Sequence, residues 1–152
     1  MFKKGQGATE YLIILAIVII IALIVVGAMG GIPGIGTGAK ARASASFWQT
    51  ADIAIPSYAV TASDDNMVLN LRNNLRDSIS SISATVNAKA ATCQATSLAA
   101  GQTTSCTVAL VTTCDAGDAY SFDVSVTYTD SATGASYTFT GEGQKLEGKC
   151  AT

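Results

Sequence analysis

The chain of 152 residues contains no histidine, and only 13% of its residues are charged. Histidine and paired carboxylates carry most general acid–base catalysis, so this composition disfavours an enzyme. The stretch 31–38 is rich in glycine but does not follow a strand pattern, which argues against a phosphate-binding loop. We therefore expect no catalytic residues and no cofactor.

Positive charge is also scarce. Nine lysines and arginines stand against eleven acidic residues, giving a net charge of −2. Beyond the first ten residues the basic side chains are scattered, at Lys40, Arg42, Arg72, Arg76, Lys89, Lys145 and Lys149. The chain therefore lacks the clustered positive charge that binds the phosphate backbone of DNA or RNA, and we expect no nucleic-acid partner.

What the sequence does have is a long apolar run near its start. From Tyr11 to Met29 there are nineteen consecutive uncharged residues, rich in Ile, Leu and Val. As a helix this run would be about 28 Å long, enough to span the hydrocarbon core of a membrane. Lys3 and Lys4 precede it and no basic residue follows until Lys40, which places the remainder of the chain outside the cytoplasm.

A secretory signal peptide is an alternative, with small residues for cleavage near Gly30. The apolar run is longer than the usual core of such a signal, about 7–15 residues. A carboxylate also stands at its edge, Glu10, for which a discarded segment has no use. Both features favour a retained helix.

The nine residues KKGQGATEY, from Lys3 to Tyr11, resemble the class III signal peptide of archaeal type IV-like pilins. In that family a short basic leader ends in Gly before Gln, and a Glu-Tyr pair precedes the hydrophobic helix. The pattern here has Ala8 where the family commonly has Ser. The resemblance is specific over about the first thirty residues and loose over the remainder.

The resemblance implies that a prepilin peptidase cuts between Gly5 and Gln6, so that Glu10 becomes the fifth residue of the mature chain. It further implies a homo-oligomeric helical filament, built by pilus assembly machinery and used for surface adhesion. The subunit would reside in the membrane before assembly and in an extracellular cell-surface filament afterwards. Gln6 and Glu10 are the residues it implicates in assembly.

Four cysteines, at positions 93, 106, 114 and 150, all follow the apolar run. An even number outside the cytoplasm predicts two disulfides. We favour Cys93 with Cys106, because residues 99–102 between them have turn composition, and hence Cys114 with Cys150; the other two pairings remain open. A metal site is disfavoured, since there is no C-x-x-C pair and no histidine.

The sequence predicts one helix and one head. We divide it into a leader (1–5), a hydrophobic helix with a glycine-rich hinge or stalk (6–50) and a β-rich head (51–152). Residues 27–38 contain six glycines and Pro33, which predicts a break, either a plain linker or a functional hinge. Residues 39–50 are expected to resume a helix, with Phe47 and Trp48 docking on the head.

In the head, apolar and polar residues alternate from Tyr120 to Thr129, which predicts one strand with a buried face. Turn residues 130–134 and the alternation of Tyr137 with Phe139 complete a hairpin. Earlier strands are expected at 53–60, an edge strand because of Pro56, and at 67–71, 79–86 and 106–113. The fold class is therefore α+β, a long N-terminal hydrophobic helix before an immunoglobulin-like antiparallel β-sandwich, with a mixed α+β head as the alternative.

Two functions compete. The first is the structural subunit of a pilus. The second is a single-pass surface protein whose extracellular β-sandwich binds a partner, which requires the apolar run but leaves Glu10 and the Gly5-Gln6 junction without a role.

Overall fold

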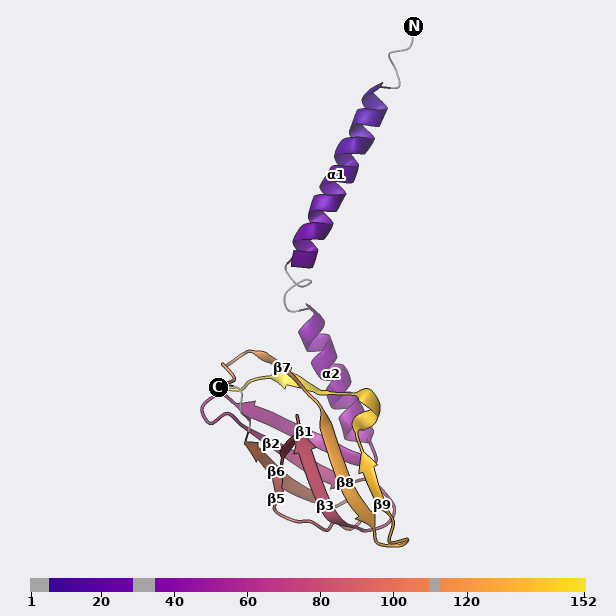
Figure 1. The fold of residues 1–152 in the computed structure, drawn as a ribbon, viewed down its shortest axis with the longest axis vertical. Helices are drawn as coiled ribbons and strands as arrows, with labels where there is room; N and C mark the ends of the chain where they lie inside the picture. Colours follow the sequence, from indigo (N-terminus) through magenta and orange to yellow (C-terminus); the bar gives the residue numbers. More distant parts are fainter. Residues whose placement is uncertain (1–5, 29–34, 110–112) are drawn as a thin grey trace. The chain divides into compact units, whose positions relative to one another are not determined.

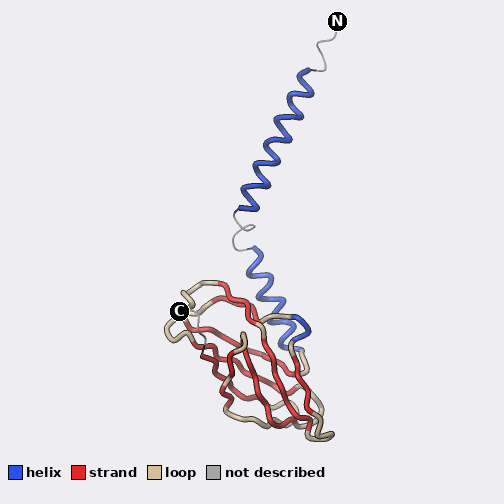
Figure 2. Tube along the Cα trace, in the orientation of Figure 1, coloured by secondary structure: helices blue, strands red, loops and turns tan. Residues whose placement is uncertain are grey.

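The computed structural model describes residues 6–28, 35–109 and 113–152 (Figure 1). Gly5 and the central part of the glycine-rich stretch, where a break was predicted, lie outside the described residues. The chain divides into two compact units, residues 1–36 and residues 37–152, and each is described by itself. Among the described residues, those up to 50 are helical and those after it are mostly in strands, drawn in blue and red in Figure 2.

Helix α1 runs from Gln6 to Ala28, 23 residues in all. Its described side chains, residues 7–25, are exposed, and this segment is long and apolar enough to cross a membrane. At about 1.5 Å per residue, the whole helix is about 34 Å long. The N-terminal apolar helix predicted from the sequence is therefore present.

Helix α2 runs from Ile35 to Thr50, four residues longer at its start than the predicted segment. The predicted start was wrong because we expected the glycines at 36 and 38 to prevent helix formation. A glycine costs only about 1 kcal/mol relative to alanine within a helix, which the surrounding turns can outweigh. The helix ends where the Thr50 hydroxyl donates to the carbonyl oxygens of Ser46 and Phe47, each at 3.2 Å.

The described residues of the head form two four-stranded antiparallel sheets and a two-stranded ribbon. The first sheet has the order β1-β2-β6-β5, formed by Ile53–Thr61, Asn66–Asn73, Thr103–Ala109 and Thr92–Cys93. The second has the order β4-β3-β8-β9, formed by Lys89–Ala90, Ile79–Val86, Val124–Asp130 and Ser136–Phe139. The ribbon pairs β10, Leu146–Lys149, with β7, Ala119–Phe122.

These strand orders are those of an immunoglobulin-type sandwich. Lettered in chain order without the ribbon strands β7 and β10, the strands reproduce A-B-E-D in one sheet and C′-C-F-G in the other. The buried core draws alternate side chains from both sheets, including Ile55, Leu69 and Val108 from the first and Val86 and Val126 from the second. The predicted fold class is therefore confirmed.

Two strand predictions need correction. The alternation from Tyr120 to Thr129 is not one strand, because the chain leaves the ribbon after Phe122 and enters the second sheet at Val124. Strands β7 and β8 keep the same alternation across Asp123, so the sequence pattern does not reveal the break. Strand β6 begins at Thr103, three residues before the predicted start, because its first residues pair with β2.

Strand β1 lies at the edge of the first sheet, as Pro56 led us to expect. Its register with β2 shifts between Ala54 and Ser57, so the proline sits in a bulge where it withholds no ladder hydrogen bond. The chain end also bridges this strand, since the Ala151 N–H donates to Val60 O at 2.8 Å.

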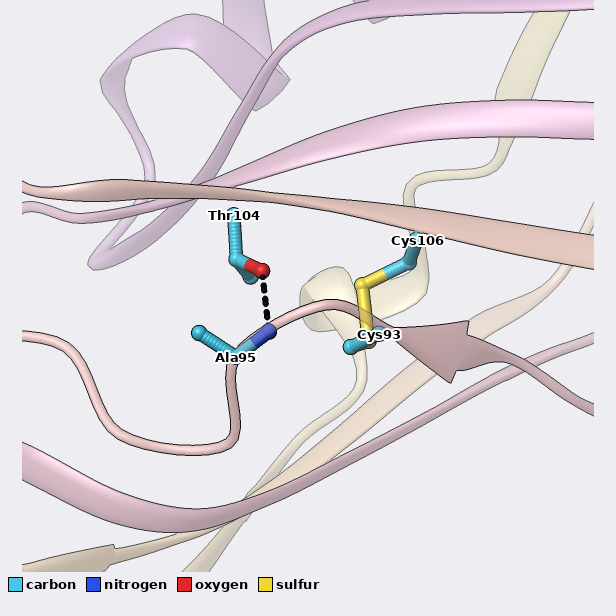
Figure 3. The surroundings of a disulfide bond; sticks show 4 residues. All are labelled: Cys93, Ala95, Thr104 and Cys106. Atoms are coloured by element: carbon cyan, nitrogen blue, oxygen red, sulfur yellow. Dashed lines mark hydrogen bonds between the residues drawn. A yellow bond between two sulfur atoms is a disulfide. The ribbon is translucent and has the colours of Figure 1, made fainter.

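Both disulfides have the pairing favoured from the sequence. Cys93 on β5 faces Cys106 on β6 across the sheet, with their Cα atoms 3.9 Å apart (Figure 3). Beside this bond, the Ala95 N–H donates to Thr104 Oγ1 at 2.9 Å. Cys114 is joined to Cys150, which ties the chain end to the segment after β6.

Candidate assembly site on the apolar helix

Helix α1 is apolar on every side. Ile, Leu and Val occupy most positions from residue 12 to residue 25, and no face of the helix gathers polar residues. A helix of this kind is stable only when lipid or other helices surround it. The described part of the first unit provides no such cover, because no part of the segment Gly7–Val25 is buried.

Glu10 is the one charged residue in this helix. It is the fifth residue of α1, so the first turn contains no acidic side chain. A favourable interaction with the helix dipole falls off within the first turn. Within the described part of the chain, its carboxylate makes no hydrogen bond or ion pair. Helix dipole and neighbours therefore provide little compensation for this charge.

The predicted cleavage junction falls at the start of the helix. Gln6 is the first residue of α1, whereas Gly5 lies outside the described residues. If the chain is cut there, the new α-amino group lies within the first turn of the helix, one turn from Glu10. The cut itself stays a prediction.

Helix α2 is fixed to the head by a buried serine. Ser44 is only 3% exposed; its hydroxyl donates to Lys145 O at 2.7 Å and accepts the Glu147 N–H at 3.1 Å. The Tyr58 hydroxyl donates to Glu147 O at 2.9 Å. Each hydroxyl proton is then in use, so the 3.3 Å approach of Ser44 to Tyr58 is a contact between oxygens.

Trp48 anchors the same helix in the core of the head. It is fully buried, and its indole N–H donates to Lys145 O at 3.2 Å. Its ring meets Phe47 and Phe139 edge to face, at centroid distances of 5.4 and 5.9 Å. Gly141 lies against the indole with no room for a Cβ atom. The predicted docking through Trp48 is confirmed.

Sequence reasoning missed Ser44, Tyr58 and Gly141, which all lie where α2 packs on the head. A serine in an Ala- and Ser-rich helix has no pattern that marks it as buried. Gly141 carries a weak signal, since the GEG motif at 141–143 predicts a tight turn. Which residue that turn approaches is a matter of tertiary structure.

The ribbon contains the most perturbed tyrosine. Burial, with a smaller contribution from Tyr58, raises the pKa of Tyr120 from 10.0 to about 12. Its ring stacks on Phe122 at 5.1 Å, and Gly148 lies beneath its hydroxyl. In the described ranges, no group of three or more Cys, Asp or Glu side chains is arranged to hold a metal ion.

No protein-family model matches the chain, and no curated protein sequence matches it. Among solved structures, it is similar to the archaellum periplasmic stator protein complex FlaF and FlaG from Sulfolobus acidocaldarius. The sequence identity is 17% and the TM-score 0.36, over 59% of this chain and 89% of that chain. A likeness this distant carries no argument about function.

Proposed function

We propose that the chain is a pilin, the structural subunit of an extracellular archaeal type IV-like pilus. It is made as a membrane precursor, cut between Gly5 and Gln6 by a prepilin peptidase, and polymerised through α1 by pilus assembly machinery. The β-rich heads are then displayed on a surface filament that serves adhesion. The observation that carries the proposal is a single uncompensated carboxylate on a helix that is otherwise apolar all round.

The exposed apolar helix supports the first part of this proposal. Lipid covers α1 before assembly, and the α1 helices of neighbouring subunits cover it afterwards. Both surroundings are apolar and approach the helix from all sides, which accounts for the absence of a polar face. A helix that only packed on its own head would need one apolar stripe.

Glu10 supports the second part. Near the membrane surface its carboxylate reaches water, but in a filament core it loses that water. A buried charge without a partner costs several kcal/mol, so assembly requires a cation beside it. Cleavage before Gln6 creates one, an α-amino group absent from the precursor, which a neighbouring subunit displaced along the filament can bring to Glu10. Cleavage before Gln6 is thus required before neighbouring subunits can pack together.

The head fits display outside the cell. Two disulfides among its four cysteines suit an oxidising, extracytoplasmic setting, and no cysteine is left free. Ser44 and Trp48 fix the end of α2 to the sandwich, so that movement of α2 is passed directly to the head.

A membrane-anchored surface protein with a binding head remains the second candidate. The exposed apolar helix favours it as much as it favours a pilin. It assigns no task to Glu10, and it predicts a chain that keeps its first residues. The N-terminus of the mature protein therefore separates the two functions: Gln6 for the pilin, Met1 for the anchored protein.

The decisive experiment replaces Glu10 by Ala and by Gln, and replaces the exposed head residue Glu142 by Ala as a control. We expect all three chains to be inserted and cut before Gln6, as read by mass spectrometry of membrane and extracellular fractions. Electron microscopy should show normal filaments with Glu142→Ala and few or none with either Glu10 variant. Gln has nearly the same shape as Glu but no charge, so Glu10→Gln tests the effect of the charge alone.

Abundant filaments from Glu10→Gln would mean that the carboxylate serves no assembly contact. An intact Met1 on extracellular filaments would refute the cleavage step. If wild-type cells carry the chain with an intact Met1 and form no filament from it, the anchored protein replaces the pilin as the favoured function.

A further inference from the structure

Tyr11 stands at the boundary between the polar start of α1 and its apolar part. It directly follows Glu10, and from residue 12 to residue 39 the sequence contains no charged and no aromatic side chain. Tyr11 is 65% exposed on the helix. Tyrosine and tryptophan gather at membrane surfaces, because their rings are apolar while their polar groups reach water. Residues 12–39 contain no such anchor for the outer end of the helix.

The direction of the side chain suits an interface at this end of α1. In an α-helix each Cα–Cβ bond tilts toward the helix N-terminus. The Tyr11 side chain therefore leans away from the apolar part, toward the turn that contains Gly7 and Ala8. Nothing lies within 4 Å of a Cβ atom added at Gly7, so the ring does not pack over this residue. It is available to lipid headgroups.

The apolar part of α1 is slightly shorter than the core of a membrane. Residues 12–28 span about 26 Å at about 1.5 Å per residue, against a core of about 30 Å. A helix that is too short draws flanking residues inward unless an anchor holds them at the surface. The outer flank, residues 29–39, carries no charge that would oppose this movement. The inner flank carries Glu10 and Tyr11.

Glu10 and Tyr11 act differently on the position of the helix. A carboxylate is stabilised by water at any distance from the membrane, so Glu10 resists entry into the core without fixing a depth. A tyrosine ring is more stable at the interface than in water or in the core, so Tyr11 favours one depth. Tyr11 thus makes the outer flank, and not the inner one, supply the missing length.

We propose that Tyr11 is a positioning residue, which sets the depth of α1 and so keeps the Gly5–Gln6 junction at the cytoplasmic surface of the membrane. The inference rests on the membrane insertion and the cleavage within the proposed function. Gln6 lies five residues before Tyr11 in α1, about 8 Å along the helix axis. The headgroup layer is about 5–8 Å thick on each side of a bilayer, so the junction stands at its outer limit. A shift of one helical turn, about 5.4 Å, would draw the junction among the headgroups.

The leader lysines have a different task. Lys3 and Lys4 orient the helix by remaining on the cytoplasmic side. A lysine side chain is long and flexible, and it reaches the surface from a range of depths. Both lysines also leave with the leader after cleavage, whereas Tyr11 stays in the mature chain.

Cysteine labelling of the full chain measures the depth of α1. All four native cysteines are paired in disulfides, so Ala8→Cys gives the chain a single free thiol. This position lies three residues before Tyr11, about 4.5 Å along the axis and within the headgroup layer. A membrane-impermeant maleimide is added to inside-out membrane vesicles. Mass spectrometry then follows the labelling of the uncut precursor and, in separate pulse-chase samples, the appearance of chains that begin at Gln6.

Three variants in the Ala8→Cys background test the anchor. Tyr11→Leu removes it and should lower the initial rates of labelling and of cleavage at least about fivefold, because the inner flank is drawn inward. Tyr11→Trp restores an interfacial ring and should keep both rates within about twofold. Ile24→Leu, at a 63% exposed position near the other end of α1, is the matched control and should change neither rate.

Equal labelling of Tyr11→Leu and its parent would overturn the proposal, because the depth of α1 would not depend on the ring. Slower cleavage of Tyr11→Leu at an unchanged labelling rate would also overturn it, and would mean that the peptidase recognises the ring itself. Slower labelling with normal cleavage would refute the link to the junction. Wild-type chains that keep Met1 would refute the cleavage step of the proposed function, and the labelling rates would then decide the role of Tyr11 alone.

Discussion

Replacing Gly141 by alanine probes the packing that holds α2 on the head. Gly141 has a positive φ of 70°, and an added Cβ would lie 2.5 Å from Trp48 Cζ2, with Cη2 closer still. Carbon atoms do not approach this closely without a shift of the indole or of the turn. The indole is fully buried between Phe47 and Phe139 and has little room to move.

The expected destabilisation has two parts. A non-glycine residue in the left-handed region costs about 1–2 kcal/mol. Overpacking a filled core costs typically about 1–3 kcal/mol more. Gly141→Ala should therefore lower the free energy of unfolding by about 2–5 kcal/mol, a large share of the stability of a domain this size.

Gly143, two residues further on, provides the control. Its φ is also positive, at 84°, but nothing lies within 4 Å of an added Cβ. Gly143→Ala should therefore cost only the backbone part, about 1–2 kcal/mol. The difference between the two variants isolates the contact with Trp48.

Guanidinium unfolding of the full chain in detergent, followed by circular dichroism, measures each variant. Trp48→Phe removes both indole atoms that an alanine at 141 would strike. In that background we expect Gly141→Ala to cost about 1–2 kcal/mol, as Gly143→Ala does, giving a compensating coupling of about 1–3 kcal/mol. If Gly141→Ala costs the same in both backgrounds, or no more than Gly143→Ala, the tight contact with Trp48 does not exist.

Three further outcomes are expected. Ser44→Ala should lower the free energy of unfolding by about 1–3 kcal/mol in the same assay, because the Glu147 N–H loses its hydrogen-bond acceptor. A loss under about 0.5 kcal/mol would show that Ser44 does not hold α2 on the head. Replacing Cys114 and Cys150 by serine should cost about 1 kcal/mol more than removing the other disulfide, because the sequence separation is 36 rather than 13. Tyr120 should ionise only near pH 12 in an ultraviolet titration. The unfolded chain loses this proton near pH 10, so the stability that Tyr120 contributes is intact below pH 10 and is lost between pH 10 and about 12. Titration of every tyrosine near pH 10 would contradict the burial of Tyr120.

Much of the head could be predicted from local patterns. Strand β3 has the predicted bounds, and the β8–β9 hairpin forms where turn residues separate two alternating segments. At that turn Asp130 accepts hydrogen bonds from the N–H groups of Thr133 and Ala132, which lowers the pKa of its carboxyl. Alternation and turn chemistry are properties of neighbouring residues, so a sequence displays them directly.

The assignment of strands to sheets could not be read in this way. Tyr120 to Thr129 keeps one alternation through two sheets, because Asp123 redirects the chain without changing which side chains face inward. The same limit applies to edges. Pro56 marks β1 as an edge from the sequence, whereas the open side of β9 follows only from which strands lie beside it.

The sequence by itself determined the apolar helix, the place of Glu10 on it, and a β-rich domain with two disulfides, because length, composition and cysteine number act through general physical rules. Only the tertiary structure decided that Ser44 and Trp48 fix α2 to the head and that Gly141 must lack a side chain. These roles depend on residues about a hundred positions apart in the chain. A contact over that distance is set by the packing of the whole core, and no local pattern encodes it.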